Sequence, residues 1–271
     1  QAARVSLLDI LGVPGWVPRL SRLRAGPALR SMKRLADGAI ERRRREGRAG
    51  VADLLDLLLE GSDPRSGRRM TTPELRDNLL TFIVAGHETT ALTLGWALYL
   101  CAHDPAVQDR ARAEARAVIG RGVAGAEDVA RLPYLRQVID EALRLYPPAA
   151  FLARTARAPD MLCGREIRPA DTIILPIYAL HRHHQHWHEP DRFDPERFAP
   201  GRRDGHAAYL PFGDGPRICI GAQFAMQEAV IALAVLMSRF RFESLPETKP
   251  WPVQKLTTQP QGGLPMKVVR R

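Results

Sequence analysis

Two long stretches of hydrophobic residues predict the longest helices of this chain. The first begins after Thr71 and continues to about residue 103, with a capping-box spacing of Thr71 and Glu74 and with Pro73 in its first turn. At 1.5 Å per residue, this helix is about 45 Å long. The second covers about residues 220–238 and is apolar nearly all round. Such a pattern is typical of a helix that is buried on every side, and the remaining amphipathic helices are too few to cover both long helices, so we expect exposed apolar surface.

Shorter periodic stretches predict the remaining elements. Helical spacing of apolar residues indicates further helices near 27–46, 51–60, 104–119 and 132–145. Short strands are expected near 150–155, 161–168, 172–176, 240–244 and 253–269. The segment 177–219 is predicted to be mostly irregular, and an irregular segment of that length is usually functional. The pattern therefore predicts a mainly α fold with small β-sheets, of the α+β class, in one large domain of 271 residues.

The positive charge of the chain is concentrated near its start. The net charge is +10, and the segment from Arg19 to Arg48 holds eleven Lys or Arg and three acidic residues. A basic segment can bind nucleic acid or an anionic membrane, but apolar residues recur at helical spacing from Leu29 to Ile40. We interpret the segment as an amphipathic helix with a solvated basic face. No nucleic-acid-binding motif accompanies it, so we expect no nucleic acid partner.

Hydropathy and cysteine content bear on where the protein works. Hydrophobic residues make up 45% of the chain, which is enough for a sizeable core. No uninterrupted stretch of eighteen apolar residues predicts a membrane span. The three cysteines, Cys101, Cys163 and Cys219, form no disulfide framework, so we expect a reducing compartment and a cytoplasmic location.

The segment 212–221 presents one cysteine from a glycine-rich turn. It reads Phe-Gly-Asp-Gly-Pro-Arg-Ile-Cys-Ile-Gly, and the second long helix follows directly. Free N–H groups at a helix N-terminus stabilise a thiolate, and glycines let the backbone approach a flat cofactor. Arg217 can pair with a carboxylate on that cofactor. A single cysteine is more often a buried structural thiol, but these surroundings are those of a cysteine that ligates a haem iron, and they favour this role for Cys219.

Polar residues interrupt the first long helix at 85–90, which reads Ala-Gly-His-Glu-Thr-Thr. One interpretation is a threonine bonded to a carbonyl one turn earlier, beside a glutamate that faces solvent. The other is a binding site, because the small Gly86 allows a ligand to lie against the helix. An acid next to a hydroxyl, as at Glu88 and Thr89, can relay protons to bound dioxygen.

Five of the eight histidines lie between residues 181 and 188. A zinc site is one interpretation. The run contains no thiol, however, and no paired ligands stand at helical spacing elsewhere in the chain. We therefore expect adventitious metal binding or none.

Four segments resemble one family, in the same order along the chain. The pattern Phe-x-x-Gly-x-Arg-x-Cys-x-Gly over 212–221 resembles the proximal loop of the cytochrome P-450 superfamily at every fixed position. The polar segment 85–90 resembles its distal helix, 141–144 its Glu-x-x-Arg helix, and 195–198 its Pro-Glu-Arg-Phe loop. The resemblance is to the bacterial-like soluble type and begins near Arg19. It implies that residues 1–271 are the C-terminal part of a single P-450 domain that lacks its N-terminal elements.

The resemblance assigns roles to individual residues. It implies haem b with Cys219 as the ligand of the iron, and Glu88 and Thr89 as the catalytic pair. Residues that would contact the cofactor or line its oxygen pocket are Ala85, Gly86, Arg154, Phe212, Gly213, Arg217, Cys219 and Gly221. Glu141, Arg144 and Arg197 would form a buried triad whose role is architectural.

The same resemblance implies a monooxygenase that inserts one oxygen atom of O2 into a small hydrophobic organic substrate. The electrons would come from a ferredoxin or flavodoxin type of partner with an NAD(P)H reductase, because the chain carries no flavin or iron–sulfur motif of its own. The basic residues Arg202, Arg203 and Arg217 suit an acidic partner. The competing hypothesis is a non-catalytic or weakly haem-binding fragment of such an enzyme.

Overall fold

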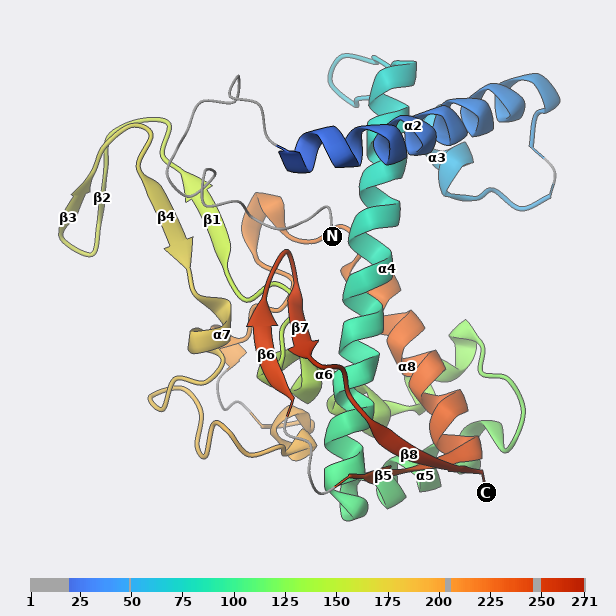
Figure 1. Ribbon diagram of the computed structural model, residues 1–271, viewed down its shortest axis with the longest axis vertical. Helices are drawn as coiled ribbons and strands as arrows, with labels where there is room; N and C mark the ends of the chain where they lie inside the picture. Colours follow the sequence, from blue (N-terminus) through green and yellow to red (C-terminus); the bar gives the residue numbers. More distant parts are fainter. Residues whose placement is uncertain (1–19, 49, 203–205, 246–249, 271) are drawn as a thin grey trace. The chain divides into compact units, whose positions relative to one another are not determined.

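A computed structural model of the chain describes residues 20–48, 50–202, 206–245 and 250–270 (Figure 1). The chain forms two compact units, Gln1–Glu88 and Thr89–Arg271, and each is described by itself. One helix, α4 (Thr72–His103), belongs to both. Its bounds are those that the sequence predicts.

The first unit contains α2 (Leu20–Glu46), α3 (Leu54–Glu60) and the start of α4. Asp53 and Asp56 form a capping box at the start of α3, and Arg43 near the end of α2 contacts both carboxylates, at 2.8 and 2.5 Å. The basic segment therefore forms a helix, as predicted. However, Arg43 does not lie on a face that contacts only solvent, because its two ion pairs join α2 to α3. Leu35, expected on the apolar face of this helix, is 72% exposed.

A capping box also fixes where α4 begins. The Thr71 N–H donates to a Glu74 carboxylate oxygen at 2.8 Å, and the Glu74 N–H reaches the Thr71 hydroxyl at 3.4 Å. The helix ends where Asp104 caps the next one, α5 (Pro105–Ile119), by accepting from the Val107 N–H at 3.1 Å. Local capping chemistry thus sets both ends of the long helix.

The end of α4 and three further helices build the core of the second unit. α5 packs on α6 (Pro133–Leu145) and on α8 (Ala222–Arg239), and α6 also packs on α8. The short helix η1 (Ala126–Arg131) contacts α5 and α8. The side chains that fill this core include Trp96, Ile139, Leu233 and Met237, each with no exposed surface.

Polar side chains join these core elements at their ends. The Gln108 side chain donates to the carbonyls of Cys101 and Phe242 at 2.9 and 2.8 Å and accepts from the Phe242 N–H at 2.8 Å. The Glu114 carboxylate accepts from the N–H groups of Tyr134 and Leu135 at 2.9 and 2.8 Å. A carboxylate on α5 therefore caps the N-terminus of α6, which has no side-chain cap of its own.

The described strands form four two-stranded antiparallel sheets (Figure 1). The pairs are β1 (Leu152–Thr155) with β4 (Thr172–Leu175), β2 (Asp160–Leu162) with β3 (Arg165–Ile167), β5 (Phe240–Ser244) with β8 (Met266–Arg270), and β6 (Trp251–Gln254) with β7 (Thr258–Gln261). The stretch 161–168 is therefore a hairpin and not one strand. The chain reverses at Cys163 and Gly164, which both have positive φ, 49° and 75°.

The segment 177–219 is mostly irregular, as predicted. It contains one turn of helix, α7 (Ile177–Leu180), and the short helices η2 (Pro195–Phe198), η3 (His206–Ala208) and η4 (Gly215–Arg217).

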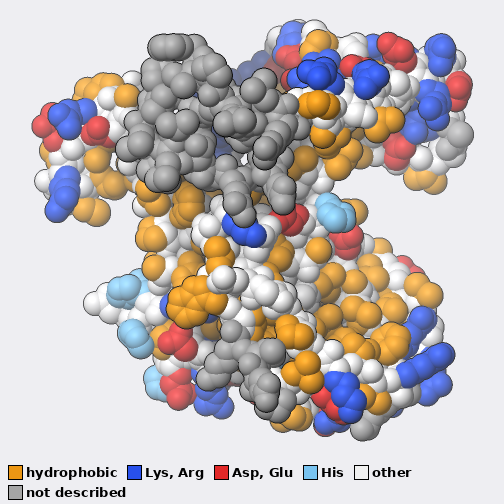
Figure 2. All heavy atoms as spheres, in the orientation of Figure 1, with side chains coloured by type: hydrophobic (Ala, Val, Ile, Leu, Met, Phe, Trp, Pro, Cys, Tyr) orange, Lys and Arg blue, Asp and Glu red, His pale blue; other side chains and the backbone are white. Residues whose placement is uncertain are grey.

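The helix expected at 220–238 is covered on one face only, which agrees with the expectation that the other helices are too few to cover it. α8 begins at Ala222 and buries one face, on which Met226, Val230 and Leu233 lie. On another face Phe224 is 71% exposed. Hydrophobic side chains gather on the surface of the second unit over α8 (Figure 2). The apolar pattern identifies the helix, but it does not say which faces are covered.

Candidate functional site

Backbone hydrogen bonds close the loop that presents Cys219. The Cys219 N–H donates to the Phe212 carbonyl at 2.9 Å, and the Ile218 N–H donates to the Gly215 carbonyl at 3.1 Å. The Asp214 carboxylate accepts from the Gly215 N–H at 2.6 Å. This frame holds Cys219 at the surface of the second unit, where the residue is exposed. Exposure distinguishes it from a buried structural thiol such as Cys101.

The loop needs glycine at specific positions. Gly213 has φ of 74°, and a Cβ there would lie 3.3 Å from a methyl group of Leu152 on β1. A Cβ on Gly221 would lie 3.9 Å from the Cys219 sulfur. Glycine at 213 therefore allows β1 to pack close to the loop, whereas a side chain at 221 would make ordinary contact with the thiol. Cys219 stands three residues before the start of α8, so it precedes the helix N-terminus instead of belonging to its first turn.

Exposed apolar side chains flank the thiol along the chain. Ile218 is 54% exposed, Ile220 84% and Phe224 71%. Phe151, which precedes the loop's neighbour Leu152, is 48% exposed. Large exposed hydrophobic side chains on either side of an exposed thiol in the sequence are typical of a surface that covers an apolar ligand.

Two arginines were expected to contact the cofactor. Arg217 lies in η4, two residues before Cys219, and is exposed. Arg154 lies on β1 opposite Ile173, is exposed, and donates to the Ala153 carbonyl at 2.9 Å. Both belong to the unit that carries Cys219, and both guanidinium groups are accessible to an anionic ligand.

The residues expected around dioxygen all lie on α4. Ala85, Gly86 and Glu88 belong to the first unit, and Thr89 is the first residue of the second. A Cβ on Gly86 would meet no atom within 4 Å, so this face of the helix is open. The Thr89 carbonyl accepts from the Thr93 hydroxyl at 2.9 Å. Of these four residues, only Thr89 lies in the unit that carries Cys219.

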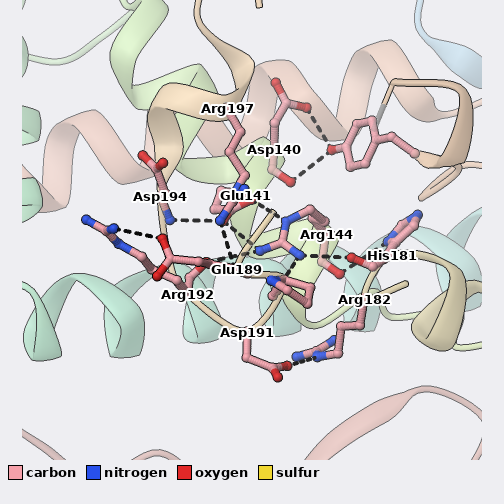
Figure 3. Close-up of polar contacts among 12 residues, drawn as sticks. Asp140, Glu141, Arg144, His181, Arg182, Glu189, Asp191, Arg192, Asp194 and Arg197 are labelled. Carbon is pink, nitrogen blue, oxygen red and sulfur yellow. Dashed lines mark hydrogen bonds and ion pairs between the residues drawn. The ribbon is translucent and has the colours of Figure 1, made fainter. Parts of the chain in front are cut away.

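Glu141, Arg144 and Arg197 meet in the interior of the second unit (Figure 3). The Arg144 Nε and Nη2 groups donate to the two Glu141 oxygens at 2.6 and 2.8 Å, and neither side chain is exposed. Arg197 Nε lies 3.4 Å from Glu141 Oε1. The Asp194 N–H donates to the same oxygen at 2.9 Å. Burial raises the pKa of the Glu141 carboxyl, while the two guanidinium groups and this N–H oppose that effect.

The Arg144 guanidinium also holds the irregular segment in place. Its Nη1 donates to the carbonyls of His181 and Pro190 at 2.8 and 2.6 Å, and its Nη2 donates to the carbonyl of Arg192 at 3.1 Å. The Trp187 ring lies 5.0 Å from its central carbon. One side chain of α6 therefore fixes three points of the segment that leads to the cysteine loop (Figure 3).

His181 is a member of this cluster that the sequence analysis did not single out. It is fully buried, with its ring Nδ1 3.2 Å from the Arg144 carbonyl and its Nε2 accepting from the Leu210 N–H at 2.8 Å. Burial lowers the pKa of its imidazole to about 4. A signal was present in the sequence, because His181 directly follows the apolar turn 177–180.

The described residues offer neither a metal cluster nor a membrane-spanning helix. No group of three or more His, Cys, Asp or Glu side chains among them could hold a metal ion. None of the helices that these residues form is both long enough and apolar enough to cross a membrane.

Comparisons with known proteins agree with this arrangement. The sequence profile of the family Cytochrome P450 matches residues 4–267. Cyclooctatin synthase of Streptomyces melanosporofaciens is 36% identical over 269 residues, which are 98% of this chain and 59% of that protein. Cytokinin hydroxylase of Arabidopsis thaliana is 41% identical over 220 residues, 78% of this chain and 42% of that protein.

A solved structure shares the fold. The crystal structure of a mutant cytochrome P450DA heme domain is 34% identical, with a TM-score of 0.86 over 100% of this chain and 60% of that one. The chain spans about half the length of the curated relatives it matches. The family profile covers nearly the whole sequence, and the fold is mainly helical with small sheets, so this chain belongs to the cytochrome P450 family.

Proposed function

We propose that this chain binds haem b through Cys219 and supplies the haem-binding part of a monooxygenase. The observation that carries the proposal is an exposed cysteine held by a glycine-rich loop among exposed apolar side chains. The residues fit the cofactor chemically. A thiol is a soft ligand suited to iron, Ile220 and Phe224 offer an apolar surface to a flat macrocycle, and Arg217 can pair with a carboxylate at its edge.

Each residue has a defined part in this proposal. The Cys219 thiolate would ligate the metal, and Gly213 and Gly221 would let the macrocycle approach the backbone. Arg154 and Arg217 pair with its propionates, and Phe212 supports the loop from the core side. Ala85 and Gly86 leave open space on α4 for dioxygen. Haem b, when bound, supplies an iron that activates O2 for insertion of one oxygen atom into a substrate C–H bond.

Glu88 and Thr89 are the proposed proton-handling residues. A carboxyl group next to a hydroxyl can hold a proton and pass it to a bound oxygen atom, provided that water reaches the acid. Glu88 is partly exposed, which allows it to exchange protons with solvent. Glu141, Arg144 and Arg197 take no part in the reaction and position the segment that carries the cysteine loop.

The proposed partners follow from the same family. The substrate is a small hydrophobic organic molecule, and cytokinin hydroxylase is a relative whose name states such an oxidation. Electrons come from a ferredoxin or flavodoxin type of protein. Arg202 and Arg217 are exposed and would attract such an acidic partner, while Arg203 lies outside the described residues. The three free cysteines suit a reducing compartment, and the cytoplasm is the proposed location.

Spectroscopy of haem-loaded protein tests the proposal. The ferrous–CO complex should show the strongly red-shifted Soret band of thiolate ligation, and Cys219→Ala should abolish it. Cys163→Ala is the matched control, because Cys163 is also an exposed free thiol. A band that persists in Cys219→Ala, or that Cys163→Ala removes, would refute the assignment. Absence of the band in every protein would favour a fragment that does not bind haem productively.

A further inference from the structure

His181 connects the buried charged cluster to the loop that presents Cys219. Its backbone carbonyl accepts from Arg144 Nη1 at 2.8 Å, and its ring Nδ1 lies 3.2 Å from the Arg144 carbonyl, so the two residues are joined twice. On the other side of the ring, Nε2 accepts from the Leu210 N–H at 2.8 Å. Leu210 lies two residues before Phe212, whose carbonyl accepts from the Cys219 N–H at 2.9 Å.

These contacts determine the protonation state of the ring. The Leu210 N–H points at Nε2, so Nε2 must be unprotonated and the proton of the neutral imidazole must lie on Nδ1, from which it is donated to the Arg144 carbonyl. Both ring nitrogens are therefore satisfied. A second proton on Nε2 would face the Leu210 N–H and remove the acceptor. The ring has no exposed surface, so no bulk water would replace it.

The charges around the ring also favour its neutral form. Arg144 from α6 and Arg182 from the adjacent residue both oppose a positive imidazole. The Tyr209 ring lies 5.4 Å away, and its hydroxyl is directed to Asp140. The nearby Glu141 carboxylate is bonded to Arg144. No described acidic group therefore contacts the imidazole to compensate a charge.

We propose that His181 is a positioning residue for Cys219. Its neutral ring accepts one hydrogen bond from the start of the cysteine loop and donates another to the end of α6, and so holds the two together. Protonation of the ring releases the loop. Burial lowers the pKa of the imidazole to about 4 from its ordinary value of 6.5. In the folded protein the bridge is therefore lost as the pH falls through about 4, whereas the stability that it contributes is fully present above pH 6.5 and declines below it. Its effect on the iron ligand rests on the proposed haem binding, whereas its effect on the loop does not.

Two substitutions separate the two hydrogen bonds. His181→Gln can place an amide oxygen where Nε2 accepts from Leu210, and it does not titrate in this range. His181→Asn can keep a donor to the Arg144 carbonyl but is too short to reach Leu210. The control is His184→Gln, since His184 belongs to the same histidine run and is exposed.

The first measurement is amide hydrogen exchange in the haem-free protein, monitored by NMR at the amides of Leu210 and Cys219. At pH 7 we expect exchange in His181→Asn to be roughly five- to tenfold faster than in the wild type, as for the loss of one internal hydrogen bond. His181→Gln and His184→Gln should match the wild type. Equal exchange in wild type and His181→Asn would overturn the proposal.

The second measurement is the ferrous–CO spectrum of haem-loaded protein between pH 7 and 4. Wild type and His184→Gln should lose the thiolate band as the pH falls, and His181→Gln should keep it to a lower pH. Identical acid profiles for wild type and His181→Gln would overturn the proposal even if His181→Asn does not fold. If no protein shows a thiolate band but the exchange pattern is as expected, the bridge stands and the proposed haem function fails.

Discussion

Arg144 and Glu141 form a two-bonded ion pair, at 2.6 and 2.8 Å, in which neither side chain has any exposed surface. Helical spacing of three residues would more often place such a pair on a helix surface, where its contribution to stability is small. Here α6 is buried along most of its length. The pair therefore holds the irregular segment from inside the core.

Removing the Arg144 side chain should destabilise the protein strongly. Arg144→Ala leaves the Glu141 carboxylate buried with an incomplete set of partners and leaves three loop carbonyls without their donor. We expect a loss of about 3–5 kcal/mol in the free energy of unfolding and little folded, haem-competent protein. Thermal midpoint and haem content measure both effects.

The matched control for this experiment is Arg136→Ala. Arg136 lies on the same helix and pairs with Asp140 at 3.3 Å, but its side chain is 45% exposed. Its removal should cost under about 1 kcal/mol. If both variants lost stability equally, the burial of the Arg144 pair would not explain its importance.

How far the sequence predicts this molecule depends on how local the determining interactions are. The start of α4 was predicted because Thr71 and Glu74 form a capping box within the first turn of the helix. The reversal at Cys163 and Gly164 was missed although the glycine is a turn signal, because hydropathy alone does not show where a strand reverses. Capping interactions between near neighbours in the chain can be predicted from the sequence even where tertiary packing cannot.

The same contrast between local and distant interactions applies to the candidate site. Cys219 was identified because its glycines and Arg217 lie within eight residues of it. His181 was missed, since its partners Arg144 and Leu210 are 37 and 29 residues away in the chain. The exposure of Phe224 depends on what surrounds α8, and an apolar sequence pattern does not specify that.

The carboxylate of Glu114 should contribute measurably to the stability of α6. It accepts from two N–H groups, those of Tyr134 and Leu135, at a helix N-terminus where a negative charge is favourable. Glu114→Ala should lower the free energy of unfolding by about 1–2 kcal/mol, in the range of a lost N-cap. Glu114→Gln should recover part of this loss, because it keeps one acceptor.

Chemical denaturation of the two variants gives the comparison. Glu228→Ala is the control, because Glu228 is an exposed acidic residue on α8. Its effect should be within about 0.5 kcal/mol of zero. A loss in Glu114→Ala no larger than this control would show that solvent caps α6 equally well.

Alkaline pH should weaken the contact between Tyr209 and α6. The Tyr209 hydroxyl donates to the Asp140 carboxylate at 2.9 Å, and burial raises the pKa of the phenol well above 10. The folded state thus binds this proton more tightly than the unfolded state. The associated stability is present below pH 10 and is lost as the pH rises above it.

Comparison with Tyr209→Phe isolates this effect. Near pH 8 the wild type should be more stable by about 1 kcal/mol, which is the contribution of one hydrogen bond. Above pH 10 the difference should shrink and then reverse, with a slope of up to about 1.4 kcal/mol per pH unit. Parallel unfolding curves for the two proteins across this range would contradict the assignment.

Thr89 provides a test of proton handling that does not depend on stability. In the reconstituted system with a redox partner, Thr89→Ala should keep haem and substrate binding but divert electrons from product to peroxide or water, because the hydroxyl next to Glu88 is gone. The measurement is product formed per NAD(P)H consumed. The control is Thr81→Ala, since Thr81 lies on the same helix, is exposed, and donates to the Asp77 carbonyl at 2.7 Å. Unchanged coupling in Thr89→Ala, or an equal loss in Thr81→Ala, would exclude a specific part for Thr89 in the proton relay.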